Sequence, residues 1–440
     1  MSQKLNVTVC KITAFFILLT SCLNGCADTD YTGEVDKLQG QNTSVSSTIA
    51  KKPVIIKLLN GGDNKAELFS KVANSFNNSQ KDVELIVETD TVNYKTRIKT
   101  LLSSNQGPDI FTHIIGREMG EYVDAGYLKD LTGEAFLDEV RPEALESSTY
   151  NGRVYILPID TQIYGIFYNR KIFKDAGIKK IPKTIDELKD TVKKVKSKSM
   201  IPFSMLYKDS YSPGQIITIG ASSLFADANH RIEGDASFTF KKPEFKRFLD
   251  ILDIMRDNSQ PDFLNTDIHD QYLLFSEEKA AMMPCGNWAI MQIREMNPKI
   301  DAGIFPLPVS DNPEDILVPA DYQLGFNVYA HTKNMEAVRK FLEFFVDSDG
   351  PAKTYYESNG VPTAIITKDA YIDPMLHEIM NLADSGQSVH WLSNSSPIGF
   401  NEECADLTKQ YIVAGGMDRD NFIDRLDRLF KEAASEPHGE

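Results

Sequence analysis

Residues 54–62 read Val-Ile-Ile-Lys-Leu-Leu-Asn-Gly-Gly, an apolar run that ends in a turn signal. This pattern predicts a buried strand followed by a loop. A helix is expected to begin next, with Asn64 as its N-cap and Glu67 completing the capping pattern. Four apolar residues then recur at helical spacing, namely Phe69, Val72, Ala73 and Phe76. The organised part of the chain therefore begins with a strand and an amphipathic helix.

The same alternation continues along the chain. Val83–Val87 predicts a second strand, about Asn93 to Ser103 a second helix, and Asp109–Thr112 a third buried strand. This order is typical of a parallel sheet with crossover helices.

A second series of elements begins after Gly152. Thr184 to Glu187 forms a capping box that opens a helix ending near Ser199. Other strands are expected at 154–158, 164–168, 280–283, 303–307 and 325–330, and other helices near 246–256 and 277–282. The sequence thus predicts an α/β fold made of two bodies.

The N-terminal residues predict export. Two lysines precede an uncharged run from Ile12 to Ser21, which is typical of a signal peptide and too short to span a membrane. Leu19-Thr20-Ser21-Cys22 resembles the lipobox of bacterial lipoproteins, whose cysteine becomes the acylated N-terminus, with palmitate among the expected acyl groups. Cys26 is the alternative attachment site, and an ordinary secretory signal is the alternative reading. We expect a lipid-anchored protein on the extracytoplasmic face of the cell membrane.

The residues after the signal predict a tethered, acidic protein. Residues 22–52 form the anchor and a polar linker, which as flexible coil would span on the order of 25 to 30 Å. Removal of residues 1–21 takes away Lys4 and Lys11 and no acid, so the net charge falls from -16 to -18. Such a charge argues against nucleic acid as a partner.

Only two cysteines, Cys285 and Cys404, lie in the organised part of the chain, which is too sparse for a disulfide scaffold. They are expected to be buried apolar residues, and a bridge between them stays open.

A series of short segments runs in a fixed order along the chain. They are Pro108–Phe111, Asn151–Asp160, Phe167–Asn169, Ala176–Ile178, Lys279–Met282, Gly286–Trp288, Phe305–Pro308 and Gly360–Pro362. Each is weak alone. Together, from about Pro53 to Phe430, they resemble the extracellular solute-binding proteins, family 1, of ABC importers, a group that includes maltose-binding protein.

This resemblance implies a two-lobed periplasmic-binding-protein fold of type II, with a ligand cleft between the lobes. The implied lobes are 53–160 with about 325–385, and 161–324 with about 390–435, joined by crossings near 157–165, 318–326 and 389–393. It also implies capture of a sugar or oligosaccharide by lobe closure and delivery to the permease subunits and ATPase of an importer. No cofactor and no metal are expected.

Candidate ligand residues follow from the crossings and strand ends. Trp288 and Trp391 fall where the family places aromatic rings against a sugar, although a tryptophan can equally be core. Asp160, at the end of a strand, could accept hydroxyl hydrogen bonds, each worth roughly 1.5 to 3 kcal/mol; a solvated acid is the alternative. The remaining candidates are Tyr164, Asp321 and Tyr322 at the crossings, and Asn60, Glu88 and His113 in the first lobe.

Other functions compete with this one. A surface glycoside hydrolase would need two carboxylates. A binder of another solute class (amino acid, polyamine or phosphorylated polyol) is a further alternative, and a phosphate or carboxylate ligand would favour Arg117 in the cleft. Tyr355 and Tyr356 resemble the adjacent tyrosines of ferric-ion binders. The sequence has no G-x-S-x-G and no P-loop, and His377-Glu378 lacks the second histidine of a zinc protease. We therefore expect no enzyme.

Overall fold

The computed structural model describes residues 52–435 apart from 63–64, 115, 209–211, 227–237, 351–352, 368–370, 398 and 414–415. The predicted signal peptide, Cys22, Cys26, the linker up to Lys51 and the predicted cap Asn64 lie outside the described residues. Residues 51–440 form a compact unit by their own contacts. Within its described part, no helix combines the length and apolarity needed to cross a membrane.

The first three strands form the predicted parallel arrangement. β1 (Val54–Asn60) pairs in parallel with β2 (Val83–Thr89) on one side and β3 (Ile110–Ile114) on the other. The crossovers are α1 (Ala66–Ser79) and α2 (Tyr94–Ser103). The four apolar residues predicted to face inward on α1 are all buried, which confirms the helical spacing.

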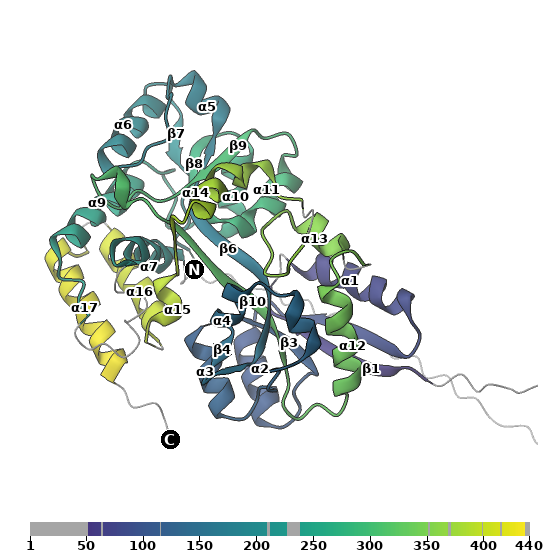
Figure 1. Ribbon diagram of the computed structural model, residues 1–440. Coiled ribbons are helices and arrows are strands. Elements are labelled where there is room, and N and C mark those ends of the chain that lie inside the picture. The colour runs from purple at the N-terminus through teal and green to yellow at the C-terminus, as the bar shows by residue number, and fades with distance from the viewer. Residues whose placement is uncertain are drawn as a thin grey trace, which may run out of the picture. The chain divides into compact units, whose positions relative to one another are not determined.

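One strand replaces the two that the sequence predicted on either side of residue 160. β6 runs without a break from Ile156 to Asn169. Its first half pairs antiparallel with β10 (Val318–Val328), and its second half pairs with β8 (Ala280–Gly286) and β9 (Ala302–Phe305). Figure 1 shows β6 and β10 side by side along much of their length.

The described strands join into a nine-stranded sheet with the path β2-β1-β3-β10-β6-β8-β7, where β7 is Ile201–Phe203. β10 also pairs with β11 (Ser388–Val389) at its start. The second and third predicted crossings therefore lie next to each other.

The capping box at Thr184 is confirmed. The Thr184 hydroxyl accepts the Glu187 N–H at 3.2 Å, and the Glu187 carboxylate accepts the Lys183 N–H at 2.7 Å, at the start of α6 (Ile185–Lys196). The helix predicted at 277–282 is wrong. α10 (Ile268–Ser276) ends before it, and Glu278 has a positive φ, which turns the chain into β8.

The remaining described elements surround the sheet. Helices of the first half are α3 (Arg117–Asp124), η2 (Ala135–Glu139), α4 (Pro142–Ser147), α5 (Arg170–Asp175), α7 (Ser212–Leu224) and α9 (Pro243–Asp257). Helices of the second half are η3 (Asn287–Ala289), α11 (Ile290–Met296), η4 (Pro313–Asp315), α12 (Met335–Val346), α13 (Lys353–Asn359), η5 (Pro374–Leu376), α14 (His377–Asp384), α15 (Leu392–Ser395), α16 (Phe400–Ile412) and α17 (Arg419–Ser435). β4 (Thr149–Tyr150) and β5 (Arg153–Val154) form a separate pair.

Buried apolar side chains form three clusters. The first cluster is built on β1, β2, β3, α1, α2 and α12, the second on α6, α7, α9, α16 and α17, and the third on β8, β9, α10, α11 and η5. Strand β6 contributes residues to all three clusters. Ile156, Leu157 and Ile159 belong to the first cluster, whereas the following residues alternate between the other two. The strand thus leaves one core and enters the next, as in a two-lobed fold.

The lobe boundaries stay a prediction. Ile379 of α14 lies in the third cluster together with residues of β8 and β9, although the predicted boundaries gave its segment to the first lobe.

A buried ion pair ties three segments of the first cluster together. Lys65 Nζ lies 2.9 Å from Asp160 Oδ2, and both side chains are almost completely buried. Tyr355 donates its hydroxyl hydrogen bond to the same carboxylate at 3.0 Å, and Asn359 Nδ2 donates at 2.8 Å. Such a pair is costly to break, because the remaining charge is left buried without its partner.

We therefore predict that Lys65→Met lowers the free energy of unfolding by about 3 to 5 kcal/mol. The matched control is Lys71→Met on α1, whose exposed pair with Glu67 should contribute less than about 1 kcal/mol. Urea unfolding of both variants measures the difference. Equal losses in the two variants would contradict a special role for the buried pair.

Candidate functional site

Three aromatic rings meet where β6, β8 and the chain before α15 come together. The Tyr164 and Trp288 ring centroids lie 6.1 Å apart, Trp288 and Trp391 also 6.1 Å, and Tyr164 and Trp391 6.4 Å. These three residues come from distant parts of the sequence, and all three are among the predicted ligand residues. We call them the aromatic trio.

Trp288 is fixed in place by its two preceding residues. Its ring lies directly over Gly286, where an added Cβ would be 1.8 Å from a ring atom, so only glycine fits beneath it. Asn287 Nδ2 donates to the Thr161 carbonyl at 2.9 Å, and Asn287 Oδ1 accepts the Ile163 N–H at 3.2 Å. Asn287 thus ties the Trp288 turn to β6 at the crossing.

The two tryptophans differ in exposure. Trp391 is 1% exposed and packs in the second cluster, and its indole Nε1 has no hydrogen-bond partner among the described residues. Trp288 is only partly buried and packs against the second and third clusters. Of the two, Trp288 is the ring that can offer a face to a solute, and the burial of Trp391 favours a core role.

Asp321 organises the chain that precedes α15. Its buried carboxylate accepts the Trp391 N–H at 3.1 Å and the Asn394 side-chain amide at 2.7 Å. The His390 ring nitrogen lies 3.4 Å from the other carboxylate oxygen. This hydrogen bond and the charge of Asp321 raise the pKa of His390 above its ordinary value, against the opposing effect of burial. These contacts favour a positioning role for Asp321.

Tyr322 follows Asp321 on β10 and packs in the first cluster. Neighbouring residues of a strand face opposite sides, so the two side chains serve different parts of the molecule. Burial raises the pKa of the Tyr322 phenol to about 12, so the hydroxyl stays protonated. Its Cα partner on β6 is Thr161, which places Tyr322 at the same crossing as Asn287.

The other predicted ligand residues lie apart from the aromatic trio. Asp160 already accepts from Lys65, Tyr355 and Asn359, which favours a structural role over sugar binding. Asn60 is completely buried, and its amide group bonds to both backbone groups of Gly62 in the turn after β1.

Two further candidates lie in the first half of the chain. Glu88 is half-buried and pairs with Arg97. His113 lies on β3 opposite Gly325 of β10, and its side chain, like that of Arg117, is outside what the structure describes.

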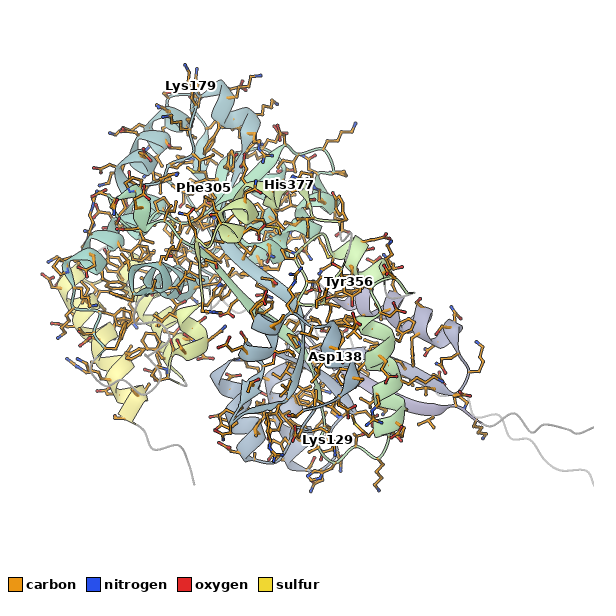
Figure 2. The ribbon with its side chains drawn as sticks, in the orientation of Figure 1. Lys129, Asp138, Lys179, Phe305, Tyr356 and His377 are labelled. Atoms are coloured by element: carbon orange, nitrogen blue, oxygen red, sulfur yellow. The ribbon has the colours of Figure 1, made fainter. Side chains whose placement is uncertain are left out.

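The two adjacent tyrosines are poor metal ligands in this arrangement. Tyr355 donates to Asp160, and Tyr356, labelled in Figure 2, donates to the Phe345 carbonyl. Burial raises the pKa of both phenols well above the ordinary value, which disfavours the phenolates that ferric ion requires. Among the described residues, no group of three histidine, cysteine, aspartate or glutamate side chains could hold a metal ion. Cys285 and Cys404 are both buried and are not joined in a disulfide.

Sequence reasoning missed three residues that shape this region. Asn287 lies in the Gly286-Asn287-Trp288 segment, and its position beside Trp288 could have suggested that its side chain binds the neighbouring strand. Asn394 and Lys65 carry no local signal, because their partners lie 73 and 95 residues away.

Comparison with known proteins agrees with this architecture. Residues 62–350 match the family of bacterial extracellular solute-binding proteins. The multiple sugar-binding protein of Streptococcus mutans is 25% identical over 359 residues, covering 80% of this chain and 84% of that protein. The melibiose/raffinose/stachyose-binding protein MelE of Bacillus subtilis is 24% identical over 339 residues, covering 74% and 78%.

Solved structures share the fold. The solute-binding protein RafE in complex with raffinose superimposes with a TM-score of 0.76 at 24% identity, covering 87% of this chain and 100% of that one. RafE of Streptococcus pneumoniae without ligand gives a TM-score of 0.71 at 24% identity, covering 87% and 99%. A sugar transporter protein of Bacillus licheniformis in complex with stachyose gives 0.71 at 18% identity, covering 86% and 100%.

Proposed function

The chain belongs to the family of bacterial extracellular solute-binding proteins, and from this premise we propose that it captures a neutral oligosaccharide between its lobes for an ABC importer. The observation that carries the proposal is the aromatic trio at the crossing strands, with Trp288 partly open. A pyranose has a face of C–H groups that packs on an indole ring, and its hydroxyls lie around the rim. Closure of the lobes would remove water from such a contact.

The relatives narrow the solute class. Two relatives are named for multiple sugars and for melibiose, raffinose and stachyose, and two structural neighbours hold raffinose and stachyose. These ligands share small size, several hydroxyls and no charge. We propose a neutral sugar of two to four units for this protein, delivered to the permease subunits and ATPase of the importer.

The contacts of the two acids on the crossing strands, Asp160 and Asp321, agree with a protein that binds its solute without reacting with it. Asp160 and Asp321 are buried and fully engaged with protein donors. A glycosidase would need one carboxyl group to protonate the leaving oxygen and a second to act as base or nucleophile. Since both acids are committed to holding the crossings in place, we propose no enzymatic role for this region.

We predict that raffinose, stachyose, melibiose or maltotriose stabilises residues 51–440, whereas amino acids, polyamines and ferric citrate do not. A ligand at 100 times its dissociation constant stabilises the native state by about 2.7 kcal/mol, a thermal shift of a few degrees. Trp288→Ala should weaken binding roughly tenfold to a hundredfold, as loss of an aromatic anchor does.

Titration calorimetry measures this change, with Tyr371→Ala as the control because Tyr371 is an exposed aromatic residue outside the trio. Full affinity in Trp288→Ala would reject the proposed site. A shift with a solute of another class would reject the carbohydrate.

We also propose that Cys22 carries the lipid anchor, with Cys26 as the alternative. The full-length exported chain should then partition into the detergent phase of a Triton X-114 extraction, and Cys22→Ala should move it to the aqueous phase while Cys26→Ala should not. An aqueous wild-type protein would reject the anchor. The reverse pattern in the two variants would move the anchor to Cys26.

A further inference from the structure

One lysine joins carboxylates from two parts of the molecule that have separate cores. Lys95 lies on α2, whose buried residues belong to the first cluster, and Glu402 lies on α16, whose buried residues belong to the second. Lys95 Nζ is 3.3 Å from Glu402 Oε1 and 3.6 Å from Glu118 Oε1 of α3. We call these three residues the latch.

A second contact joins Gly116 and Asn394. Gly116 is two residues before Glu118 in the sequence, and Asn394 is eight residues before Glu402. A Cβ built on Gly116, just before α3, would lie 3.5 Å from the Cα, the Cβ and the carbonyl oxygen of Asn394 on α15. Gly116 has a φ of +141°, a conformation that favours glycine. The loop after β3 therefore lies beside α15, with room for no more than van der Waals contact between a side-chain carbon and Asn394.

The Asn394 side of this contact is held rigidly. Asn394 donates to Asp321 of β10 at 2.7 Å, and the Leu392 N–H of the same short helix donates to Ser222 of α7 at 2.8 Å. Asn394 is therefore held both by the crossing strand β10 and, through α15, by the second cluster. The partners on the other side, Lys95 and Gly116, belong to elements built on the first cluster.

These contacts differ in kind from the crossing strands. β6 and β10 are continuous chains with a hydrogen-bonded ladder, so they stay together in any arrangement of the lobes. The latch is a side-chain contact between exposed residues, about 60% exposed for Lys95 and Glu402, and it can open without breaking a strand pair.

From this geometry we infer that Lys95 is a positioning residue that stabilises the joined arrangement of the two lobes, and so sets how tightly the proposed solute is held. The inference rests on the proposed function for its effect on affinity. Burial lowers the pKa of Lys95, but Glu118 and Glu402 outweigh it and raise the pKa above its ordinary value. The lysine is therefore charged throughout the neutral range.

The arrangement of the latch predicts that loss of Lys95 and loss of Glu402 have effects of different size. Removing Glu402 leaves Lys95 paired with Glu118. Removing Lys95 takes away the cation that Glu118 and Glu402 both contact, and like charges repel. Loss of Lys95 should therefore weaken the joined arrangement more than loss of Glu402.

The first test is the affinity of residues 51–440 for raffinose, or for the sugar of the panel with the largest thermal shift. We expect Lys95→Met to raise the dissociation constant about three- to fivefold at low salt, on the scale of an exposed ion pair, and Glu402→Gln to raise it about twofold. Lys95→Arg should keep wild-type affinity. In 0.5 M NaCl the differences should shrink, because salt screens exposed charges.

Lys99→Met is the matched control. Lys99 is an exposed lysine on the same helix, with no ion pair to an acid among the described residues. Its loss removes the same charge without touching the latch. Equal effects of Lys95→Met and Lys99→Met, or effects that do not change with salt, would overturn the inference.

A second test needs no ligand. Lys95→Cys with Glu402→Cys should be joined rapidly by a short bismaleimide, whereas Thr100→Cys with Glu402→Cys should react slowly, because Thr100 lies on another side of α2. The native Cys285 and Cys404 should not react with the bismaleimide, since both are buried and burial raises the pKa of Cys404 to about 12.

The two tests separate the two proposals. Equally slow cross-linking of both pairs overturns the latch, whatever the protein binds. Rapid cross-linking of the latch pair without binding of any sugar keeps the contact and rejects the proposed solute class instead.

Discussion

The antiparallel pairing of β6 with β10 is the constraint on which the rest of the structure depends. From Ile156 to Ile163 the two strands face each other, with register shifts around Leu324. Beyond Ile163, β6 leaves β10 and pairs with β8 and β9. Gly325 sits at the irregularity, and a Cβ there would be 2.2 Å from Ile156 and 2.8 Å from the Leu157 carbonyl. The strands can pack this closely only because position 325 has no side chain.

Each crossing strand carries one buried carboxylate, and each carboxylate binds hydrogen-bond donors from other segments of the chain. Asp160 of β6 gathers Lys65, Tyr355 and Asn359, whereas Asp321 of β10 gathers the backbone of Trp391 and the side chain of Asn394. Buried charges are stable only when paired and hydrogen-bonded. Because the acids fix the frame, the partly buried Trp288 is the ring of the aromatic trio that we propose to meet a solute.

The sequence predicted what local patterns control. Helical spacing on α1, the capping box of α6 and the first parallel strands follow from residues close in the chain, and the structure confirms them. The gathering of Tyr164, Trp288 and Trp391 followed from a family resemblance rather than from local pattern. The break predicted within β6 was wrong because hydrogen bonds to β10 and then to β8 and β9 keep the strand continuous. No local pattern in residues 159–163 indicates these partners. The structural role of Asp160 could not be foreseen either, because Lys65 lies at the start of α1, far along the chain, and the pair forms only when the first cluster closes around it.

The central claim is that two lobes joined at β6 and β10 close on a neutral oligosaccharide. Small-angle X-ray scattering of residues 51–440, with and without saturating raffinose, tests this most directly. Closure predicts a smaller radius of gyration in the presence of the sugar, with no change on addition of the same concentration of an amino acid. An unchanged radius with raffinose bound, as judged by calorimetry on the same sample, would contradict the account.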